Sequence, residues 1–397
     1  MVPRMVAITP GDALDPATFS GTTRRLLQAL ERRGALAAAV DGRPEALALV
    51  EKAAAFDRDG ERWRHFYNAG ATPVSPLIRA GMSRVASARA NRAAAASGAD
   101  AFLQVTGWYV PRPAPPPGAA PLVRASYHDG NLATFLTRPD LKIDRSSRRV
   151  RRALAYERGL YDQLDVILTM SEWLRRSFVE DFGQPEEKVV AVGAGPNFDD
   201  VPEAPGPRDW SVPRLLFVGK QWERKGGPEV LAGFAALRAE HPEATLTIVG
   251  TTLPGPTPPG VEVVGLLDRT DPAQNARFEA ALRTATAFVM PSRYEPFGIA
   301  FLEAMAFAVP CVGSDSCAMP EIIADGVTGA VVPAGDGEAL GAALLALAVD
   351  PDGARRMGEA ARERLLERFT WDAVAGRTVQ AVGARLERRA PLPTTQA

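Results

Sequence analysis

Short apolar runs alternate with helical segments along this chain, and the whole alternation occurs twice. The first set comprises Met5–Thr9, 101–110, 121–128, Val166–Met170 and 188–192, and the second comprises 214–219, 244–250, 261–267, Ala287–Ser292, 310–314 and 329–335. Runs this short, separated by segments of helix length, are typical of parallel strands joined by crossover helices. The pattern therefore predicts an α/β protein with two doubly wound, Rossmann-like domains, each built on a parallel sheet.

A proline-rich and acidic stretch, Asp199–Pro213, interrupts the alternation. Composition shifts of this kind mark linkers between domains. We therefore expect a first domain over residues 1–200 and a second domain over residues 201–372. The remaining residues, 373–397, should complete a helix that begins near Trp371 and end in a disordered tail.

The charged residues are almost balanced, with 46 lysines and arginines against 47 aspartates and glutamates and a formal net charge of −1. Nucleic-acid-binding proteins normally carry a basic excess, so this balance argues against a nucleic-acid partner. Only 2 cysteines and 3 histidines occur, without metal-ligand spacing, which predicts neither a metal site nor a disulfide framework. No apolar run reaches the ~18 residues of a membrane span, and the N-terminus lacks a signal-peptide pattern. Together these features predict a cytoplasmic protein.

The run EPFGIAFLE, residues 295–303, begins and ends with a glutamate and follows the apolar segment Ala287–Ser292. Pro296 suits the first position of a helix, so we expect Glu295 at the helix start and Glu303 about two turns along, roughly 12 Å away on the axis. The alternative is two unrelated glutamates, one favoured by the helix dipole and one on the surface. A glycosidase acid–base pair does not fit, because its carboxyl groups lie roughly 5–9.5 Å apart across one bond.

The first turn of this helix would also bind an anion. Free N–H groups at a helix start point outward and attract negative charge, and here they belong to Phe297, Gly298 and Ile299. A carboxylate on either side of such an anion site could hold sugar hydroxyls at one end and a ribose at the other. The run is therefore a suitable receptor for a nucleotide-diphosphate sugar.

Two lysines follow the apolar segment at 214–219. Lys220 and Lys225 flank a short turn, and two cations at a strand end can neutralise a diphosphate and stabilise it as a leaving group. Ligands of doubly wound sheets bind at the carboxyl ends of strands. Both lysines and the anion site would then converge on one pair of phosphates. The alternative is that both are ordinary surface lysines.

Two stretches of the first domain are candidates for contacting a ligand. Trp108 and Tyr109, with the proline-rich loop after them, could provide an aromatic platform for a sugar or a hydrophobic aglycone. Residues 142–158 contain a dense basic group, with Arg145, Arg148, Arg149, Arg151 and Arg152. Because apolar positions are sparse there, we favour a solvated helix face or loop over a weak contact with a membrane surface or an anionic acceptor.

Three ordered blocks of the second domain resemble those of the family-4 retaining glycosyltransferases: FVGKQWERKGGPEVLAGF, PSRYEPFGIAFLEAMAFAVPCVGS and PEIIADGVTGAVVPAGD. The Glu-x7-Glu element of that family is intact as Glu295 and Glu303. The first domain is similar more loosely, through FSGTTRRLLQALERRG, the strand ending at His128, and DVILTMSEWLRRSF. The resemblance covers nearly all of the second domain. It implies the GT-B fold, in which two Rossmann-like domains face a central cleft.

The resemblance also implies roles for residues of the second domain. Lys220 and Lys225 would bind the donor phosphates, Glu295 the transferred sugar and Glu303 the ribose of the nucleotide. No bound metal and no cofactor would be needed beyond the nucleotide-sugar co-substrate. The leaving phosphate oxygen would take the proton of the acceptor hydroxyl.

In the first domain, the resemblance implies that His128 lies across the cleft beside the reacting carbon. The loop ahead of Gly21 would close on phosphate or acceptor, and the last helix would cross back onto this domain. The alternative for His128 is a structural histidine that bonds the turn after its strand.

Three positions depart from the usual pattern of the family. Lys220 stands where arginine is usual, which keeps the charge and loses the bidentate fork. Gly21 has no second glycine beside it, and CAMPEII lacks the small-residue pair that often precedes Pro-Glu.

The sequence thus predicts a retaining, hexosyltransferase-like enzyme that moves a sugar from a nucleotide-diphosphate donor to an acceptor hydroxyl, independently of metal, in the interdomain cleft. The acceptor would be a small molecule, a glycan or a lipid-linked group. The competing hypothesis is a non-catalytic GT-B-like protein that binds a nucleotide sugar or scaffolds a partner enzyme, and the intact Glu295, Glu303 and Lys225 argue against it. A nicotinamide-dependent oxidoreductase is rejected because no helix pattern follows the glycines at 193–195.

Overall fold

The chain divides into two compact units. The computed structural model describes residues 2–9, 11–13, 21–42, 49, 76–106, 112, 122–141, 143–198, 200–202 and 206–389. The first unit comprises Met1–Thr137, Leu141–Gly193 and Trp371–Ala397, and the second comprises Arg138–Asp140 and Ala194–Thr370. The main boundaries lie at 193/194 and 370/371, where the sequence placed them at 200/201 and 372/373. The tail expected to be disordered lies outside the described residues.

Six parallel strands form the sheet of the first unit, in the order β2-β1-β3-β4-β5-β6. Their bounds are Met5–Thr9 (β1), Leu36–Asp41 (β2), Ala101–Val105 (β3), Val123–His128 (β4), Val166–Thr169 (β5) and Val189–Ala191 (β6). β1, β3 and β5 are buried along their whole length, which explains their nearly continuous apolar sequences. β2 was not predicted, because its run LAAAVD is rich in alanine, a poor strand former, and lies at the sheet edge.

The second unit also has a sheet of six parallel strands, in the order β12-β11-β10-β7-β8-β9. Their bounds are Arg214–Val218 (β7), Thr245–Val249 (β8), Val261–Gly265 (β9), Ala287–Met290 (β10), Cys311–Ser314 (β11) and Gly329–Val332 (β12). From the β9 edge, the strands run third, second, first, fourth, fifth and sixth in chain order. This is the order of a doubly wound Rossmann sheet. The predicted fold class, with two parallel-sheet α/β domains, is confirmed.

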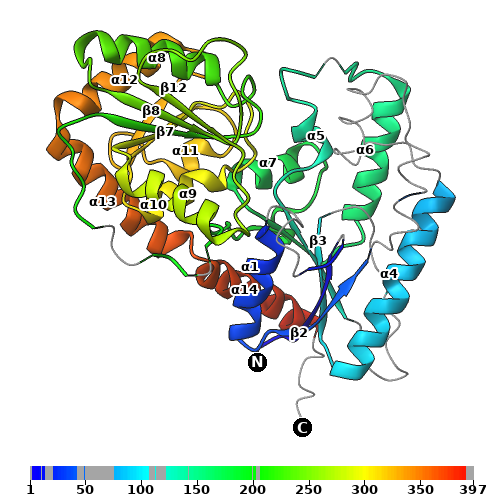
Figure 1. Ribbon diagram of the computed structural model, residues 1–397. Coiled ribbons are helices and arrows are strands. Elements are labelled where there is room, and N and C mark those ends of the chain that lie inside the picture. The colour runs from blue at the N-terminus through cyan, green and yellow to red at the C-terminus, as the bar shows by residue number, and fades with distance from the viewer. Residues whose placement is uncertain are drawn as a thin grey trace. The chain divides into compact units, whose positions relative to one another are not determined.

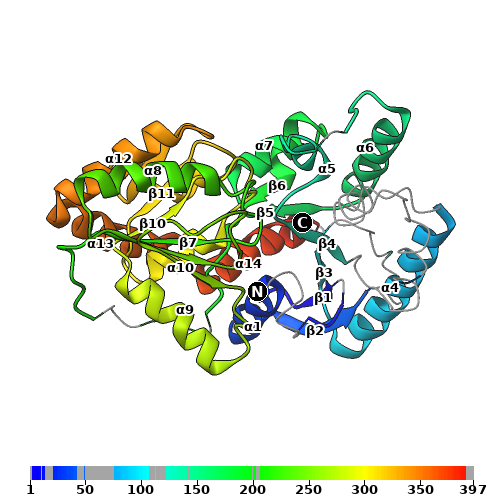
Figure 2. The ribbon, with the colours of Figure 1, turned by 45° about the horizontal axis from the view of Figure 1, so that its top comes forward.

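Helices cover both faces of each sheet (Figures 1 and 2). In the first unit they are Thr22–Arg32 (α1), Pro76–Ser97 (α4), Leu132–Phe135 (α5), Arg148–Tyr161 (α6), Glu172–Glu180 (α7), the 3-10 turn Glu186–Lys188 (η2) and Trp371–Arg389 (α14). In the second unit they are Gly227–Glu240 (α8), Pro272–Thr284 (α9), Ile299–Ala306 (α10), Met319–Ile322 (α11), Gly337–Val349 (α12) and Pro351–Arg368 (α13). Helices α8 and α12 pack together on one face of the second sheet, and α10 packs with α13.

Side-chain caps fix several of the helix starts. Ser171, just before α7, accepts a hydrogen bond from the Leu174 N–H at 3.1 Å. Asp271 does the same at the start of α9, where its Oδ1 accepts the N–H groups of Ala273 and Gln274 at 2.8 and 3.0 Å. Such caps satisfy N–H groups that have no partner inside the helix. Residues of this kind are sequence signals that mark where a helix begins.

The stretch Asp199–Pro213 is not a free linker, because it belongs to the second unit. The Arg208 guanidinium anchors it by donating hydrogen bonds of 2.8 to 3.2 Å to four backbone carbonyl oxygens, those of Leu282, Arg283, Phe307 and Ala308. These carbonyls lie at the ends of α9 and α10, where the last turn of a helix leaves its acceptors unpaired. The described residues 206–213 thus form an irregular segment that is docked onto the second unit.

The last helix, α14, packs beside α1 in the first unit (Figure 1). Arg33, just after α1, forms an ion pair of 2.7 Å with Asp372. Arg377 donates from Nε to the Val192 carbonyl oxygen at 2.8 Å. Across the described ranges, none of the helices combines the length and the apolar character that crossing a membrane requires.

Candidate functional site

The sheet order of the second unit reverses between β7 and β10, which pair with Ala287 opposite Leu215. Ligands of doubly wound sheets bind outside the carboxyl ends of the strands at such a reversal. The loop after β7 carries Lys220 and Lys225, and the loop after β10 carries Glu295. Topology alone therefore brings these predicted site residues to one edge of the sheet.

The two loops are in direct backbone contact. Gly226 has a φ of +78°, and a Cβ on this residue would lie 2.3 Å from the carbonyl oxygen of Pro291, so the approach requires glycine. The N–H of Arg293 donates to the carbonyl oxygen of Arg224 at 2.9 Å. These contacts fix the turn that carries Lys225 against the loop that carries Glu295.

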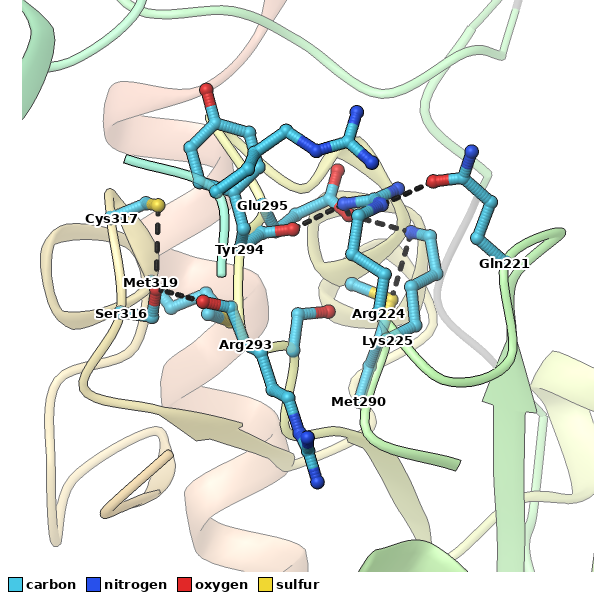
Figure 3. A network of polar contacts seen from close by, with 12 residues as sticks. Gln221, Arg224, Lys225, Met290, Arg293, Tyr294, Glu295, Ser316, Cys317 and Met319 are labelled. Carbon is cyan, nitrogen blue, oxygen red and sulfur yellow. Dashed lines mark hydrogen bonds and ion pairs between the residues drawn. The ribbon is translucent and has the colours of Figure 1, made fainter. Parts of the chain in front are cut away.

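Lys225 and Glu295 form an ion pair at the centre of this edge (Figure 3). Lys225 Nζ lies 2.8 Å from Glu295 Oε2 and 3.2 Å from Met290 Sδ, and Arg224 Nη1 lies 3.2 Å from the same carboxylate oxygen. The Lys225 and Glu295 side chains are 13% and 15% exposed. Burial by itself raises the pKa of Glu295, but the charges of Lys225 and Arg224 outweigh it and hold that pKa below its usual value. Glu295 is therefore an ionised carboxylate that is largely withdrawn from water.

Arg224 is a site residue that the sequence did not reveal. Its Nε donates to Gln221 Oε1, and its Nη1 donates to the Tyr294 carbonyl oxygen as well as to Glu295. Neighbouring residues in a regular helix or strand point in different directions, so Arg224 and Lys225 were not expected to meet one carboxylate. The turn at 222–226 allows both to do so.

Helix α10 begins at Ile299, three residues later than predicted. Gly298 is its N-cap, with a φ of +82°, and a Cβ there would lie 2.8 Å from the ring of Phe301. Pro296 therefore lies in the loop and not at the first helical position. Glu295 lies four residues before the helix, so the expected axial separation of two turns between the glutamates does not apply.

The N–H groups that were predicted to bind an anion remain unpaired despite this shift, and that of Ala300 is unpaired as well in the described chain. In the described part of the chain, no acceptor is bonded to the N–H groups of Phe297, Gly298, Ile299 or Ala300, whereas the N–H of Phe301 bonds to Gly298 at 3.0 Å. The Phe297 side chain is buried and contacts the ring of Phe369, with centroids 6.3 Å apart. That packing holds the segment ahead of α10 in place.

Glu303 is buried and paired, which excludes an ordinary surface glutamate. Its side chain is 6% exposed, and its Oε1 accepts a charge-assisted hydrogen bond from Nη1 of Arg269. Glu303 follows Ile299 by four residues, so both lie on the same face of α10, roughly 6 Å apart along the axis. The carboxylate is therefore about one turn from the anion site.

Lys220 is at the carboxyl end of β7, and its side chain is exposed. Over the residues that the structure describes, it has no ion pair or hydrogen bond, unlike Lys225. The structure thus joins Lys225 to Glu295 and leaves Lys220 at the rim of the same edge.

His128 ends β4 and lies in the aromatic core of the first unit. Its side chain is 2% exposed, its Nε2 lies 2.7 Å from Ser126 Oγ, and its ring contacts Tyr161 and Phe178 with centroids 5.7 and 5.1 Å apart. Burial lowers the pKa of His128 to about 3, so the imidazole is neutral at pH 7. This packing favours the structural interpretation, although the bond goes to Ser126 and not to the turn. A direct role in transfer stays a prediction.

The other predicted features of the first unit are described in part. Gly21 is the N-cap of α1 and has a φ of +84°, a conformation that favours glycine. The loop ahead of it, and Trp108 and Tyr109, lie outside the described residues. The basic stretch at 142–158 contributes most of α6, and its exposed arginines are Arg145, Arg148, Arg149, Arg151, Arg152 and Arg158. The expected solvated helix face is thus present.

Comparison with known proteins identifies the family. The model of the family described as Glycosyl transferases group 1 matches residues 207–364. A glycogen synthase of Mycobacterium tuberculosis is 32% identical over 254 residues, which cover 61% of this chain and 60% of that protein. An alpha-maltose-1-phosphate synthase of Mycolicibacterium smegmatis is 32% identical over 272 residues, which cover 55% of this chain and 67% of that protein. The chain thus spans less than two thirds of the length of the glycogen synthase.

Solved structures agree with this assignment at the level of the fold. A sucrose-phosphate synthase from Thermosynechococcus elongatus superposes with a TM-score of 0.62 at 19% identity, covering 97% of this chain and 100% of the other. WaaG, a glycosyltransferase involved in lipopolysaccharide biosynthesis, superposes with a TM-score of 0.59 at 15% identity, covering 95% and 99%. Both share the pair of Rossmann-like domains. The chain therefore belongs to the group 1 glycosyl transferases and has the GT-B fold.

Proposed function

We propose that this protein is a retaining glycosyltransferase that moves a sugar from a nucleotide-diphosphate donor to an acceptor hydroxyl, without a metal ion, in an interdomain cleft. One observation carries the proposal: the desolvated, ionised Glu295 pairs with two cations and is followed in the chain by a row of unpaired N–H groups, at the carboxyl ends of β7 and β10. Preorganised charges and dipoles of this kind stabilise a diphosphate leaving group.

Each part of this edge has a role in the proposed reaction. The N–H groups of 297–300, with Lys225 and the exposed Lys220, bind the diphosphate. Glu295 accepts hydrogen bonds from hydroxyls of the transferred sugar, for which an ionised carboxylate is suited. Glu303 binds the ribose of the nucleotide. The leaving phosphate oxygen takes the proton of the acceptor hydroxyl, so Glu295 is not required as a base.

The first domain supplies the acceptor side. The family relatives include a GDP-mannose-dependent mannosyltransferase that acts on a phosphatidylinositol monomannoside, and synthases of glycogen and of maltose 1-phosphate. We therefore propose a small-molecule, glycan or lipid-linked acceptor. The arginines of α6 offer an exposed basic face for an anionic acceptor or a weak contact with a membrane surface.

Donor turnover without an acceptor tests the function. Incubation with a panel that includes UDP-, ADP- and GDP-glucose and GDP-mannose should show slow release of one nucleoside diphosphate. Glu295→Gln should abolish release and leave nucleotide binding nearly intact. Glu262→Gln is the matched control, because Glu262 lies in an exposed surface pair with Arg277, and it should behave as the parent. Equal turnover by Glu295→Gln and the parent would refute the role of that carboxylate.

Three readouts separate the finer claims. Binding of a nucleotide sugar without turnover on any acceptor would support the non-catalytic alternative. Turnover that persists in excess EDTA supports metal independence, and its loss contradicts it. Once an acceptor is found, NMR of the product distinguishes retention from inversion at the anomeric carbon.

A further inference from the structure

One oxygen of the Glu303 carboxylate already has a hydrogen-bond partner within the second unit. Oε1 accepts from Arg269 Nη1, and the Glu303 side chain is 6% exposed. Burying a carboxylate to this extent costs free energy unless a charged or hydrogen-bonding partner accompanies it. Arg269 comes from the loop after β9, and it supplies that partner.

Arg269 is itself held on several sides by the protein. Its Nε donates to Asn275 Oδ1 at 3.2 Å, and its Nη2 donates to the Asn197 carbonyl oxygen at 3.3 Å. The guanidinium carbon lies 4.3 Å from the ring centroid of Phe278 and 5.2 Å from that of Phe198. Cation–π contacts and hydrogen bonds together fix the plane of the guanidinium. The orientation of the Glu303 carboxylate is thus set by the protein before any ligand arrives.

The second oxygen of Glu303 remains available. Among the described residues Oε2 has no hydrogen-bond partner, and it is not one of the fully covered oxygens that lack one. An ionised carboxylate accepts through both oxygens. Oε2 can therefore accept a hydroxyl hydrogen bond from a ligand whose phosphates occupy the anion site one turn earlier on α10.

We propose that Arg269 is a positioning residue that orients Glu303 for the ribose hydroxyls of the donor and so makes the site selective for ribonucleotides over deoxyribonucleotides. The inference rests on the proposed function, because it takes the ligand to be a nucleotide. Arg269 acts through Glu303, so its loss should remove the contribution of the ribose hydroxyls and leave that of the diphosphate.

Calorimetric binding of nucleoside diphosphates tests this role. UDP, ADP and GDP are compared with their 2′-deoxy and 3′-deoxy forms. The nucleotide that binds the parent most tightly is then used with the variants. The parent should bind the ribose form about tenfold or more tightly than at least one deoxy form, as expected for a hydrogen bond to a charged group. Arg269→Gln should lower ribonucleotide affinity to the deoxy level and leave deoxynucleotide affinity within about twofold of the parent. Retained deoxynucleotide binding shows that the variant is folded.

Two further variants sharpen the comparison. Arg269→Lys keeps the charge but loses the planar fork, so its preference for ribose should fall between those of the parent and Arg269→Gln. Arg277→Gln is the control, because Arg277 is an exposed arginine of α9, and this variant should keep the full preference for ribose. A ribose preference that persists in Arg269→Gln, or an equal loss for both sugars, overturns the inference. A parent that binds ribonucleotides and deoxynucleotides equally also overturns the inference, and the proposed function then still stands. A parent that binds none of the nucleotides overturns the proposed function as well.

Discussion

Replacing Lys225 with methionine tests whether Glu295 depends on its ion pair. The change keeps the apolar length of the side chain and removes a charge 2.8 Å from Glu295 Oε2. Removing one partner of a buried pair costs about 3–5 kcal/mol when the other is left alone. Here Arg224 remains at 3.2 Å, so we expect the free energy of unfolding at pH 7 to fall by about 1–3 kcal/mol.

The sign of the pH dependence follows from the direction of the pKa shift. In the parent, the pKa of folded Glu295 lies below its ordinary value of 4.5, so the ionised form stabilises the fold above that pH. This contribution disappears as the pH falls through the folded pKa. In Lys225→Met, burial is opposed by Arg224 alone, so the pKa of folded Glu295 rises relative to the parent. The difference in unfolding free energy between parent and variant should therefore be largest near neutral pH. It should shrink in acid, as Glu295 becomes protonated in both proteins.

Urea unfolding of both proteins between pH 4 and pH 8 measures this difference. Its slope cannot exceed about 1.4 kcal/mol per pH unit for a single carboxylate. Lys220→Met is the matched control, because it removes the same charge from an exposed side chain without an ion pair in the described chain, and should change stability by less than about 0.5 kcal/mol. A difference for Lys225→Met that is independent of pH, or that Lys220→Met reproduces, would refute the reasoning.

Two further predictions concern the surroundings of the site. The lowered pKa of His128, about 3, means that the unfolded chain takes up a proton near pH 6.5 that the folded chain does not, so stability falls below that pH. His128→Phe should reduce the loss of unfolding free energy between pH 7 and pH 5 by about 2 kcal/mol, measured by urea titration at both values, and an unchanged loss contradicts the burial of a neutral ring. Arg208→Met should lower the unfolding free energy by about 2–4 kcal/mol, because four carbonyl oxygens lose their donor, while Arg208→Lys should recover only part of it. Equal stability of the parent and both Arg208 variants would show that the segment is not anchored by this residue.

The features that sequence could predict are those encoded by neighbouring residues. Continuous apolar runs such as Met5–Thr9 and Ala287–Met290 identify buried parallel strands, and Ser171 marks the start of α7. The proximity of Lys225 and Glu295 can be predicted once the fold class is known, because a doubly wound order places the ends of β7 and β10 side by side. That prediction needs the fold class and no further information.

The features that sequence could not predict depend on contacts between distant residues or on backbone conformation. Pro296 is a good first residue for a helix, yet Gly298 adopts φ +82° and delays the start to Ile299. Arg269 reaches Glu303 across 34 positions of the chain, and no periodic pattern connects them. Helix α4, Pro76–Ser97, was missed because its many alanines and arginines show no clear apolar stripe.

The charges at the edge of the second sheet add up in a way that supports the proposed metal-free reaction. Lys225 and Arg224 carry one positive charge each and Glu295 one negative charge, so this buried group has a net charge of +1 (1 + 1 − 1). The exposed Lys220 adds another positive charge at the rim, and the N–H groups ahead of α10 add partial charges of the same sign. Each phosphate of a nucleotide-diphosphate sugar carries one negative charge. The positive charges of the buried group and of Lys220 together therefore match the charge of the donor diphosphate. Because Glu295 already offsets one cation, the exposed Lys220 and the backbone N–H groups should provide much of the attraction that a donor encounters first.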